Sequence, residues 1–152
     1  MTAKRYSNLD LLNLVDSFPN ASIHPSLHAE RLSEFSVFVH GSQTIGYLIP
    51  RVVAALEDTA LSGAHWGIAG NVVTLSGSTV EERSENIRKT VESWREHSTF
   101  EILKGWRNEL YPVYSPKGQL YFNLERSACA LFGVVTYGVR PPLAAPLSAR
   151  GL

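Results

Sequence analysis

Residues 105–126, GWRNELYPVYSPKGQLYFNLER, hold the turn and the two flanking segments from which the fold is best read. Pro116-Lys117-Gly118 predicts a turn, because proline fixes φ and glycine tolerates a positive φ. Residues 110–115 and 119–124 flank this turn and carry the aromatic and apolar side chains typical of strands. In the second arm, residues 120, 122 and 124 alternate with Tyr121 and Asn123, which places the two sets on opposite faces. The stretch therefore predicts an antiparallel β-hairpin.

The segment before this hairpin predicts the clearest helix of the chain. Thr79 followed by Glu82 matches a capping box, in which each residue satisfies a backbone N–H of the other. One stripe at helical spacing then carries Val80, Ser84, Ile87, Val91 and Trp94. The remaining face is charged, and Glu85 and Lys89 are spaced for an ion pair one turn apart. We expect this helix to lie on a sheet with its charges in water.

Further elements extend from these two. Residues 35–40 and 44–49 flank a turn at Gly41, and residues 65–69 and 71–76 flank one at Gly70, so two more hairpins are predicted. Helices are predicted over residues 7–18, 50–61 and 125–132, the last closed by Gly133, while residues 25–34 show no clear pattern. This arrangement indicates an α+β fold, a small and mostly antiparallel sheet built from hairpins with packed helices.

The domain organisation follows from where these patterns stop. Residues 1–133 are expected to form a single α+β domain, and residues 134–140 are predicted to be a strand whose domain is missing. Residues 141–152 contain proline and alanine without periodicity and are predicted to be disordered. The chain thus resembles an interrupted polypeptide.

Composition excludes several classes of function. The 14 basic and 14 acidic side chains cancel, so no long-range field favours binding to nucleic acid or to an anionic membrane. The apolar content of 44% is that of a globular domain, and no apolar run is long enough to cross a membrane. Cys129 is the single cysteine, which excludes an internal disulfide and favours a reducing compartment. We expect a cytoplasmic protein.

Known catalytic and metal-binding motifs are not present. A Nudix helix requires a glutamate six residues after a glycine, whereas Arg83 stands six residues after Gly77. His24 and His28 are interpreted as surface or packing residues rather than metal ligands, because Pro25 lies between them. Cys129 lies among small apolar residues and is interpreted as a buried structural cysteine. We assign no catalytic residue and no metal ligand.

The aromatic hairpin leaves two interpretations open. In the first, its aromatic rings stack on a flat ligand while two arginines bind a phosphate or carboxylate. The residues assigned to such a ligand site are Trp106, Arg107, Glu109, Tyr111, Tyr114 and Arg126. In the second, the aromatic residues, Tyr121 included, form the exposed face and edge of the hairpin, and four charges pair among themselves. These charges are Arg107, Glu109, Glu125 and Arg126.

Two ordered motifs indicate a family. GWRNELYPVY followed by LYFNLERSACALFGVVTYGV resembles the end of a domain of unknown function that precedes the catalytic domain in thiamine-pyrophosphokinase-related Nudix hydrolases. IGYLIP around Gly46 and Pro50 also resembles this domain, so the resemblance covers most of residues 7–140. The resemblance implies a Nudix catalytic domain as partner, a thiamine-diphosphate-like ligand, and magnesium or manganese as the cofactor of that partner.

Two functions remain to be distinguished. The resemblance implies that the Nudix box lies beyond the point where this chain turns into its proline-rich tail, so the chain alone is expected to be a non-catalytic accessory domain. The alternative is a free-standing module that binds a thiamine-like small ligand or another protein.

Overall fold

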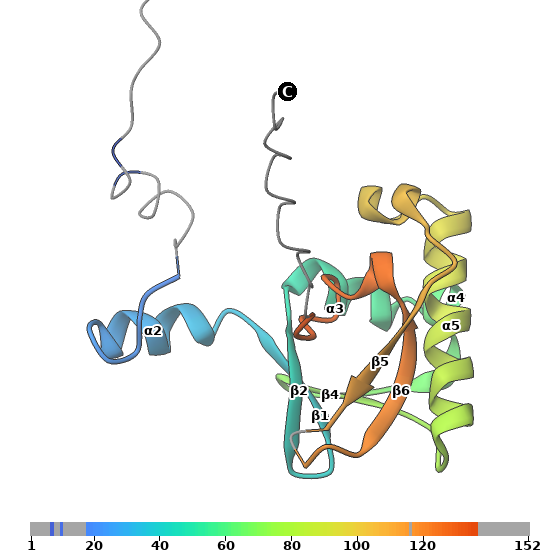
Figure 1. Ribbon diagram of the computed structural model, residues 1–152, viewed down its shortest axis with the longest axis horizontal. Coiled ribbons are helices and arrows are strands. Elements are labelled where there is room, and N and C mark those ends of the chain that lie inside the picture. Colours follow the sequence, from blue (N-terminus) through green and yellow to red (C-terminus); the bar gives the residue numbers. More distant parts are fainter. Residues whose placement is uncertain (1–6, 8–9, 11–17, 116, 137–152) are drawn as a thin grey trace, which may run out of the picture.

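A computed structural model of the chain describes Ser7, Asp10, residues 18–115 and residues 117–136 (Figure 1). Of the helix predicted over residues 7–18, only Ser7, Asp10 and Phe18 belong to this part. The tail of residues 141–152 lies wholly outside it. The described helices are α2 (Pro25–Leu32), α3 (Pro50–Glu57), α4 (Thr59–Ser62) and α5 (Val80–Glu96), with short 3-10 helices η1 (Gly63–His65), η2 (Glu101–Gly105) and η3 (Arg126–Ala128). The strands are β1 (Ser36–His40), β2 (Gln43–Leu48), β3 (Trp66–Ala69), β4 (Val72–Leu75), β5 (Leu110–Tyr114) and β6 (Leu120–Glu125).

Helix α5 begins where the capping box predicts. The Thr79 hydroxyl accepts a hydrogen bond from the Glu82 backbone N–H at 3.1 Å, and the Glu82 carboxylate accepts one from the Thr79 N–H at 3.4 Å. The predicted apolar stripe is confirmed in its C-terminal part, because Ile87, Val91 and Trp94 are fully buried. The charged face of α5 points to solvent.

The first sheet has four strands in the order β2-β1-β4-β3. The two predicted hairpins, β1–β2 and β3–β4, are confirmed as antiparallel pairs. They are joined through a parallel pairing of β1 with β4, which aligns Val37 with Val72. Since α3, α4 and η1 lie between β2 and β3 in sequence, they form the connection that such a parallel pairing requires.

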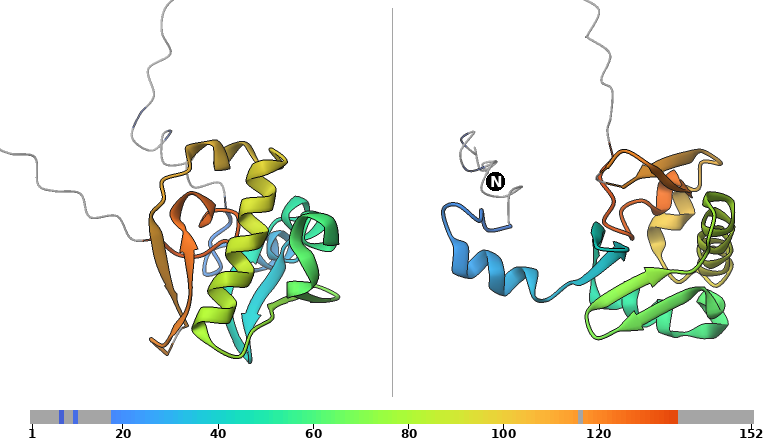
Figure 2. Two further views of the ribbon diagram at one scale, coloured as in Figure 1. Left: turned by 90° about the vertical axis from the view of Figure 1, so that its right-hand side faces the viewer. Right: turned by 90° about the horizontal axis from the view of Figure 1, so that it is seen from below.

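The second sheet is the predicted hairpin β5–β6, and α5 lies along it (Figure 2). The outer edge of β6 is closed by side chains of α5 instead of a strand. The Ser84 hydroxyl accepts a hydrogen bond from the Asn123 N–H at 2.9 Å, and Arg83 Nε donates one to the Tyr121 carbonyl at 2.8 Å. The α+β fold class with mostly antiparallel strands is thus confirmed, with the strands divided between two sheets.

Three stacked aromatic rings join these layers. Phe132 lies between Trp66, at a centroid distance of 5.5 Å, and Trp94, at 5.6 Å, and both pairs are nearly parallel. Trp66 also donates a hydrogen bond from Nε1 to the Thr90 hydroxyl at 3.0 Å. Because Trp66 comes from the first sheet and Trp94 from α5, the stack places the segment around Phe132 at the centre of the core.

The interpretation of Tyr121 as part of an exposed face is wrong. Tyr121 is only 2% exposed, and the Arg83 guanidinium lies 4.6 Å from the centre of its ring. Its other neighbours include Phe38, at a centroid distance of 6.4 Å. Strand β6 is covered by α5 and by the first sheet, so side chains on both of its faces are buried.

Two helices in the first half of the chain also differ from the prediction. Helix α2 forms where no element was assigned, and it lies beside the main body with no fully buried residue (Figure 1). The helix predicted over residues 50–61 is divided at Asp58, whose extended backbone lets its side chain accept a hydrogen bond from the Ala60 N–H. The Asp58 side chain thus caps a separate short helix, α4.

The segment after β6 is also less regular than predicted. A single 3-10 turn, η3, replaces the helix expected over residues 125–132, and Gly133 follows with a φ of 58°. Residues 134–136 form no strand, and the rest of the strand predicted over residues 134–140 lies outside the described residues.

Candidate functional site

The six residues predicted to bind a ligand are divided among three depressions of the surface. The tryptophan lines a pocket between α5 and the hairpin, the two tyrosines line a groove along β5, and the two arginines line a pocket beside η3. The glutamate lines none of these three. The structure therefore does not bring the predicted residues together around one cavity, and each depression is described separately.

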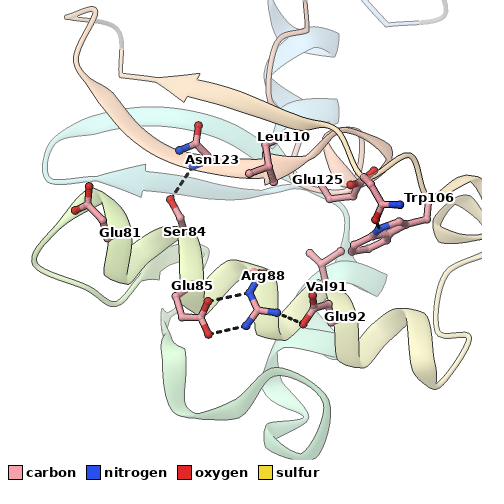
Figure 3. A pocket seen from close by; sticks show the side chains of 11 residues that line it. Glu81, Ser84, Glu85, Arg88, Val91, Glu92, Trp106, Leu110, Asn123 and Glu125 are labelled. Carbon is pink, nitrogen blue, oxygen red and sulfur yellow. Dashed lines mark hydrogen bonds and ion pairs between the residues drawn. The ribbon is translucent and has the colours of Figure 1, made fainter.

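The helix–hairpin pocket has a volume of about 380 Å³ and lies between α5 and the strands β5 and β6 (Figure 3). Four of its lining residues are glutamates, Glu81, Glu85, Glu92 and Glu125. Arg88 is the one basic residue of this lining, and it bonds Glu85 at 2.7 Å and also Glu92. The carboxylates outnumber the guanidinium, so this pocket disfavours anions.

Trp106 is held in the wall of the helix–hairpin pocket by its neighbours. Its indole Nε1 donates a hydrogen bond to Asn108 Oδ1 at 2.8 Å. The Arg95 guanidinium lies 4.6 Å from the centre of the ring, at cation–π distance. These two contacts give the ring a structural role, and stacking on a ligand stays a prediction.

The edge groove, of about 590 Å³, runs along β5 toward β2. It is lined by Thr44 and Ile45 of β2, by residues 111–115 and Gly118 of the hairpin, and by Val134 and Val135. Its rim carries exposed apolar side chains, with Tyr114 56% exposed and Val135 69% exposed. This is a mostly apolar surface between the outer edges of two sheets.

Pro112 interrupts the free edge of β5. It pairs with Asn123, whose N–H points away from β5 to the Ser84 hydroxyl. Pro112 and Asn123 therefore form a non-hydrogen-bonded pair, in which both residues direct their backbone groups away from the partner strand. The nitrogen of Pro112 faces the open edge of β5. A proline there offers no N–H to another strand.

The arginine pocket, of about 520 Å³, lies between η2 and η3. Arg107 and Arg126 line it together with Ser127, Cys129 and neighbouring small or apolar residues. At its rim, Arg126 forms an ion pair with Glu109 at 2.6 Å, which confirms one of the predicted charge pairs.

The other predicted charge pair takes a different form. Glu125 is only 6% exposed, and its Oε1 accepts hydrogen bonds from the backbone N–H groups of Arg107, at 3.0 Å, and Ser127, at 3.3 Å. It binds the main chain of Arg107 and not the guanidinium. Glu125 therefore fixes the two loops that form the arginine pocket.

A family model described as "Domain of unknown function (DUF4743)" matches residues 10–136. The chain belongs to the DUF4743 family. The match covers both sheets, α2–α5 and all three depressions, so the whole described body corresponds to the DUF4743 domain.

A curated relative of this DUF4743 chain is Nudix hydrolase 20, chloroplastic, from Arabidopsis thaliana. The two are 30% identical over 118 residues, which is 73% of this chain and 31% of the relative. The DUF4743 chain thus spans about a third of the length of that protein. This similarity supports an association of the domain with a Nudix hydrolase.

The described residues of the DUF4743 chain do not fit the divalent cation that Nudix hydrolases are expected to use. Among them, no group of three or more His, Cys, Asp or Glu side chains is placed to hold a metal ion. Two glutamates of α5 pair with basic side chains, Glu85 with Arg88 and Lys89, and Glu92 with Arg88. Arg83, which stands six residues after Gly77, donates a hydrogen bond to the Gly77 carbonyl at 3.0 Å.

Two residues at these sites were not assigned from the sequence. Ser127 lies in the arginine pocket, and Pro112 controls the β5 edge. No local pattern marks Ser127, whereas Pro112 within a strand pattern is itself a signal of an edge strand. Within the described part of the DUF4743 chain, no helix is long and apolar enough to span a membrane.

Proposed function

We propose that this DUF4743 chain is a non-catalytic accessory domain that works with a Nudix hydrolase module. The observation that carries the proposal is the match of residues 10–136 to the family, combined with similarity to about a third of a protein named as a Nudix hydrolase. The pairing of Glu85 and Glu92 with Arg88 and Lys89 supports a non-catalytic role, because these basic side chains compete with a cation for the two carboxylates. Magnesium or manganese would then be held by the catalytic module.

The edge groove is the surface that we assign to the Nudix module. Apolar side chains that are exposed next to one another on a folded domain favour burial against a partner. Tyr114 and Val135 provide such a surface on the two sides of the groove. The chain also continues past Thr136 from the side of the groove that Val134 and Val135 form.

We extend the proposal to the substrate and the compartment. The motifs GWRNELYPVY and LYFNLERSACALFGVVTYGV support thiamine diphosphate and related diphosphates as substrates of the associated module, by resemblance. The single cysteine supports the cytoplasm, and the name of the Arabidopsis relative points to the chloroplast for that protein.

The test of the accessory role uses a chimera. Residues 10–136 replace the matching segment of Arabidopsis Nudix hydrolase 20, and magnesium-dependent hydrolysis of thiamine diphosphate and nucleoside diphosphate derivatives is measured. The chimera is expected to be active and the 152-residue chain alone inactive. Turnover by the isolated chain that is lost on chelation would overturn the non-catalytic role.

A matched pair of variants tests the docking surface. Tyr114→Lys in the chimera places a charge in the edge groove and is expected to reduce activity. Tyr47→Lys is the control, because Tyr47 is similarly exposed, at 42%, and lies outside the groove lining. Equal effects of the two substitutions would contradict docking through the groove.

The alternative function, a module that binds a small ligand, is favoured by one observation. The arginine pocket contains polar groups that the fold leaves unused.

A further inference from the structure

We propose that the arginine pocket binds a small oxyanion of the phosphate class. The inference rests on the lining of this one pocket and does not depend on the association with a Nudix module. Three features support it, and they come from different segments of the chain.

The first feature is the charge of the lining. Arg107 and Arg126 are its ionisable side chains besides Cys129, and no carboxylate belongs to it. Burial raises the pKa of the Cys129 thiol to about 11, so the thiol is neutral near pH 7 and adds no negative charge. The lining of this pocket is therefore positive, although Glu109 pairs with Arg126 at the rim and Glu125 binds the main chain of Arg107 and Ser127, whereas the lining of the helix–hairpin pocket is acidic.

The second feature is the free hydrogen-bonding capacity of the two arginines. The guanidinium of Arg107 forms no hydrogen bond or ion pair with the described residues, although its backbone N–H is fixed by Glu125. Arg126 uses one nitrogen, NH1, to bind Glu109 at 2.6 Å. Since a guanidinium has five N–H donors, both side chains keep donors for a ligand. An anchored backbone also reduces the conformational entropy lost when Arg107 binds.

The third feature is an unused hydroxyl. Ser127 Oγ is buried and has no hydrogen-bond partner among the described residues. Its own backbone N–H donates to Glu125 at 3.3 Å, which fixes Ser127 in the wall of the pocket. A buried polar atom without a partner requires a ligand or a water molecule to satisfy it. Because Ser127 Oγ has almost no accessible surface, it can donate to an anion held by the arginines only after its side chain rotates toward the pocket.

These donors favour phosphate over a carboxylate. Two planar guanidinium groups and a hydroxyl offer more hydrogen bonds than the two oxygens of a carboxylate accept in a single plane. A tetrahedral anion presents oxygens in several directions, so it can bind donors that come from both η3 and the loop after η2. The apolar neighbours of the pocket exclude part of the water and thereby strengthen charge-assisted hydrogen bonds.

The experiment titrates the 152-residue chain with inorganic phosphate at constant ionic strength and follows the backbone amide signals of Arg107 and Ser127 by NMR. Constant ionic strength removes the general screening effect of the added salt. We expect saturable shifts at these two residues. Arg107→Gln should weaken binding about tenfold, the loss of one charge-assisted interaction of about 1.4 kcal/mol. Ser127→Ala should weaken it several-fold.

Lys104→Gln is the matched control. Lys104 lies on η2 next to the pocket, but it pairs with Glu101 at 2.8 Å and does not belong to the lining. The Lys104→Gln substitution removes the same unit of charge as Arg107→Gln. If phosphate were attracted only by the overall charge of the region, both variants would weaken binding equally. That result, or the absence of saturable shifts, would overturn the site. Equally tight binding of acetate would overturn the assignment to the phosphate class.

Discussion

Gly46 packs against the backbone of residues 132–133, and Gly133 packs against the backbone of Tyr47, so closely that neither glycine has room for a side chain. A Cβ atom at Gly46 would lie 2.2 Å from the Phe132 carbonyl oxygen, and one at Gly133 would lie 2.2 Å from the Tyr47 carbonyl oxygen. Real Cβ atoms do not approach backbone atoms this closely. The two glycines let the segment after η3 lie directly on β2, which brings Phe132 into its aromatic stack.

Gly46→Ala should therefore destabilise the domain. We expect the free energy of unfolding to fall by about 2–3 kcal/mol, because the new methyl group meets backbone atoms that cannot move without displacing Phe132. Urea denaturation measures the change. Gly105→Ala is the control, since a Cβ there has nothing within 4 Å, and it should change stability by less than about 1 kcal/mol. The same midpoint for both variants would contradict the close approach.

Arg83 provides a second prediction, because it is a buried cation whose hydrogen bonds go to the main chain. It is 7% exposed and donates to the carbonyls of Tyr121 and Gly77. Arg83→Met keeps much of the volume but leaves both carbonyls without their donor, so we expect a loss of about 2–4 kcal/mol in the free energy of unfolding.

Arg88→Met is the comparison for this variant. Arg88 lies on the same helix, its side chain is 47% exposed, and its ion pairs are on the surface. Such pairs contribute less than about 1 kcal/mol. If chemical denaturation showed equal losses for the two arginines, the role of Arg83 in closing the β6 edge would be refuted.

The capping box of α5 predicts a smaller effect. Thr79→Ala removes the oxygen that accepts the Glu82 N–H and should lower the free energy of unfolding by about 1 kcal/mol. The neighbouring Ser78→Ala should be close to neutral, because Ser78 binds the Glu82 carboxylate through its backbone N–H. Thermal denaturation of both variants checks the difference, and a larger loss from Ser78→Ala would be inconsistent with Thr79 as the cap.

The burial of Cys129 predicts how stability depends on pH. Burial raises the pKa of its thiol from 9.0 to about 11, so between these values the unfolded chain binds fewer protons than the folded one. The contribution of this thiol to the free energy of unfolding is therefore at its full value below pH 9, and it decreases as the pH rises to about 11.

Comparison with Cys129→Ala isolates this contribution, because other titrating groups are common to both proteins. The stability of the unsubstituted chain, relative to the variant, should be constant from pH 7 to 8.5 and should fall above pH 9. A difference that stays constant up to pH 11 would show that the thiol is not protected by the fold.

The elements that could be predicted from sequence are those whose signals are local. The capping box at Thr79 and the glycine turns at Gly41 and Gly118 lead to α5 and to the hairpins, because a few neighbouring residues determine these structures. The family resemblance, too, depends on contiguous motifs. By contrast, the parallel pairing of β1 with β4 joins segments about 35 residues apart, which no local pattern encodes.

Two features that differ from the sequence-based expectation depend on contacts between distant segments. Tyr121 alternates as an exposed residue should, yet Arg83 on α5 and Phe38 on β1 cover it, and both are distant in sequence. The six residues of the predicted ligand site are close in sequence, but Tyr111 and Tyr114 lie in β5, whereas the other four lie in the loop before β5 or in η3. Because these segments line different depressions of the surface, proximity in sequence did not produce a common cavity.

Pro112 and the side chains of α5 protect the two edges of the β5–β6 hairpin by different means. On one edge, Ser84 and Arg83 occupy the backbone groups of β6, and on the other, Pro112 removes a donor from β5. Unprotected edges template the growth of sheets from one copy to the next. A hairpin with both edges protected in this way can expose the apolar side chains of Leu110 and Tyr114 to a partner without seeding fibrils of its own kind.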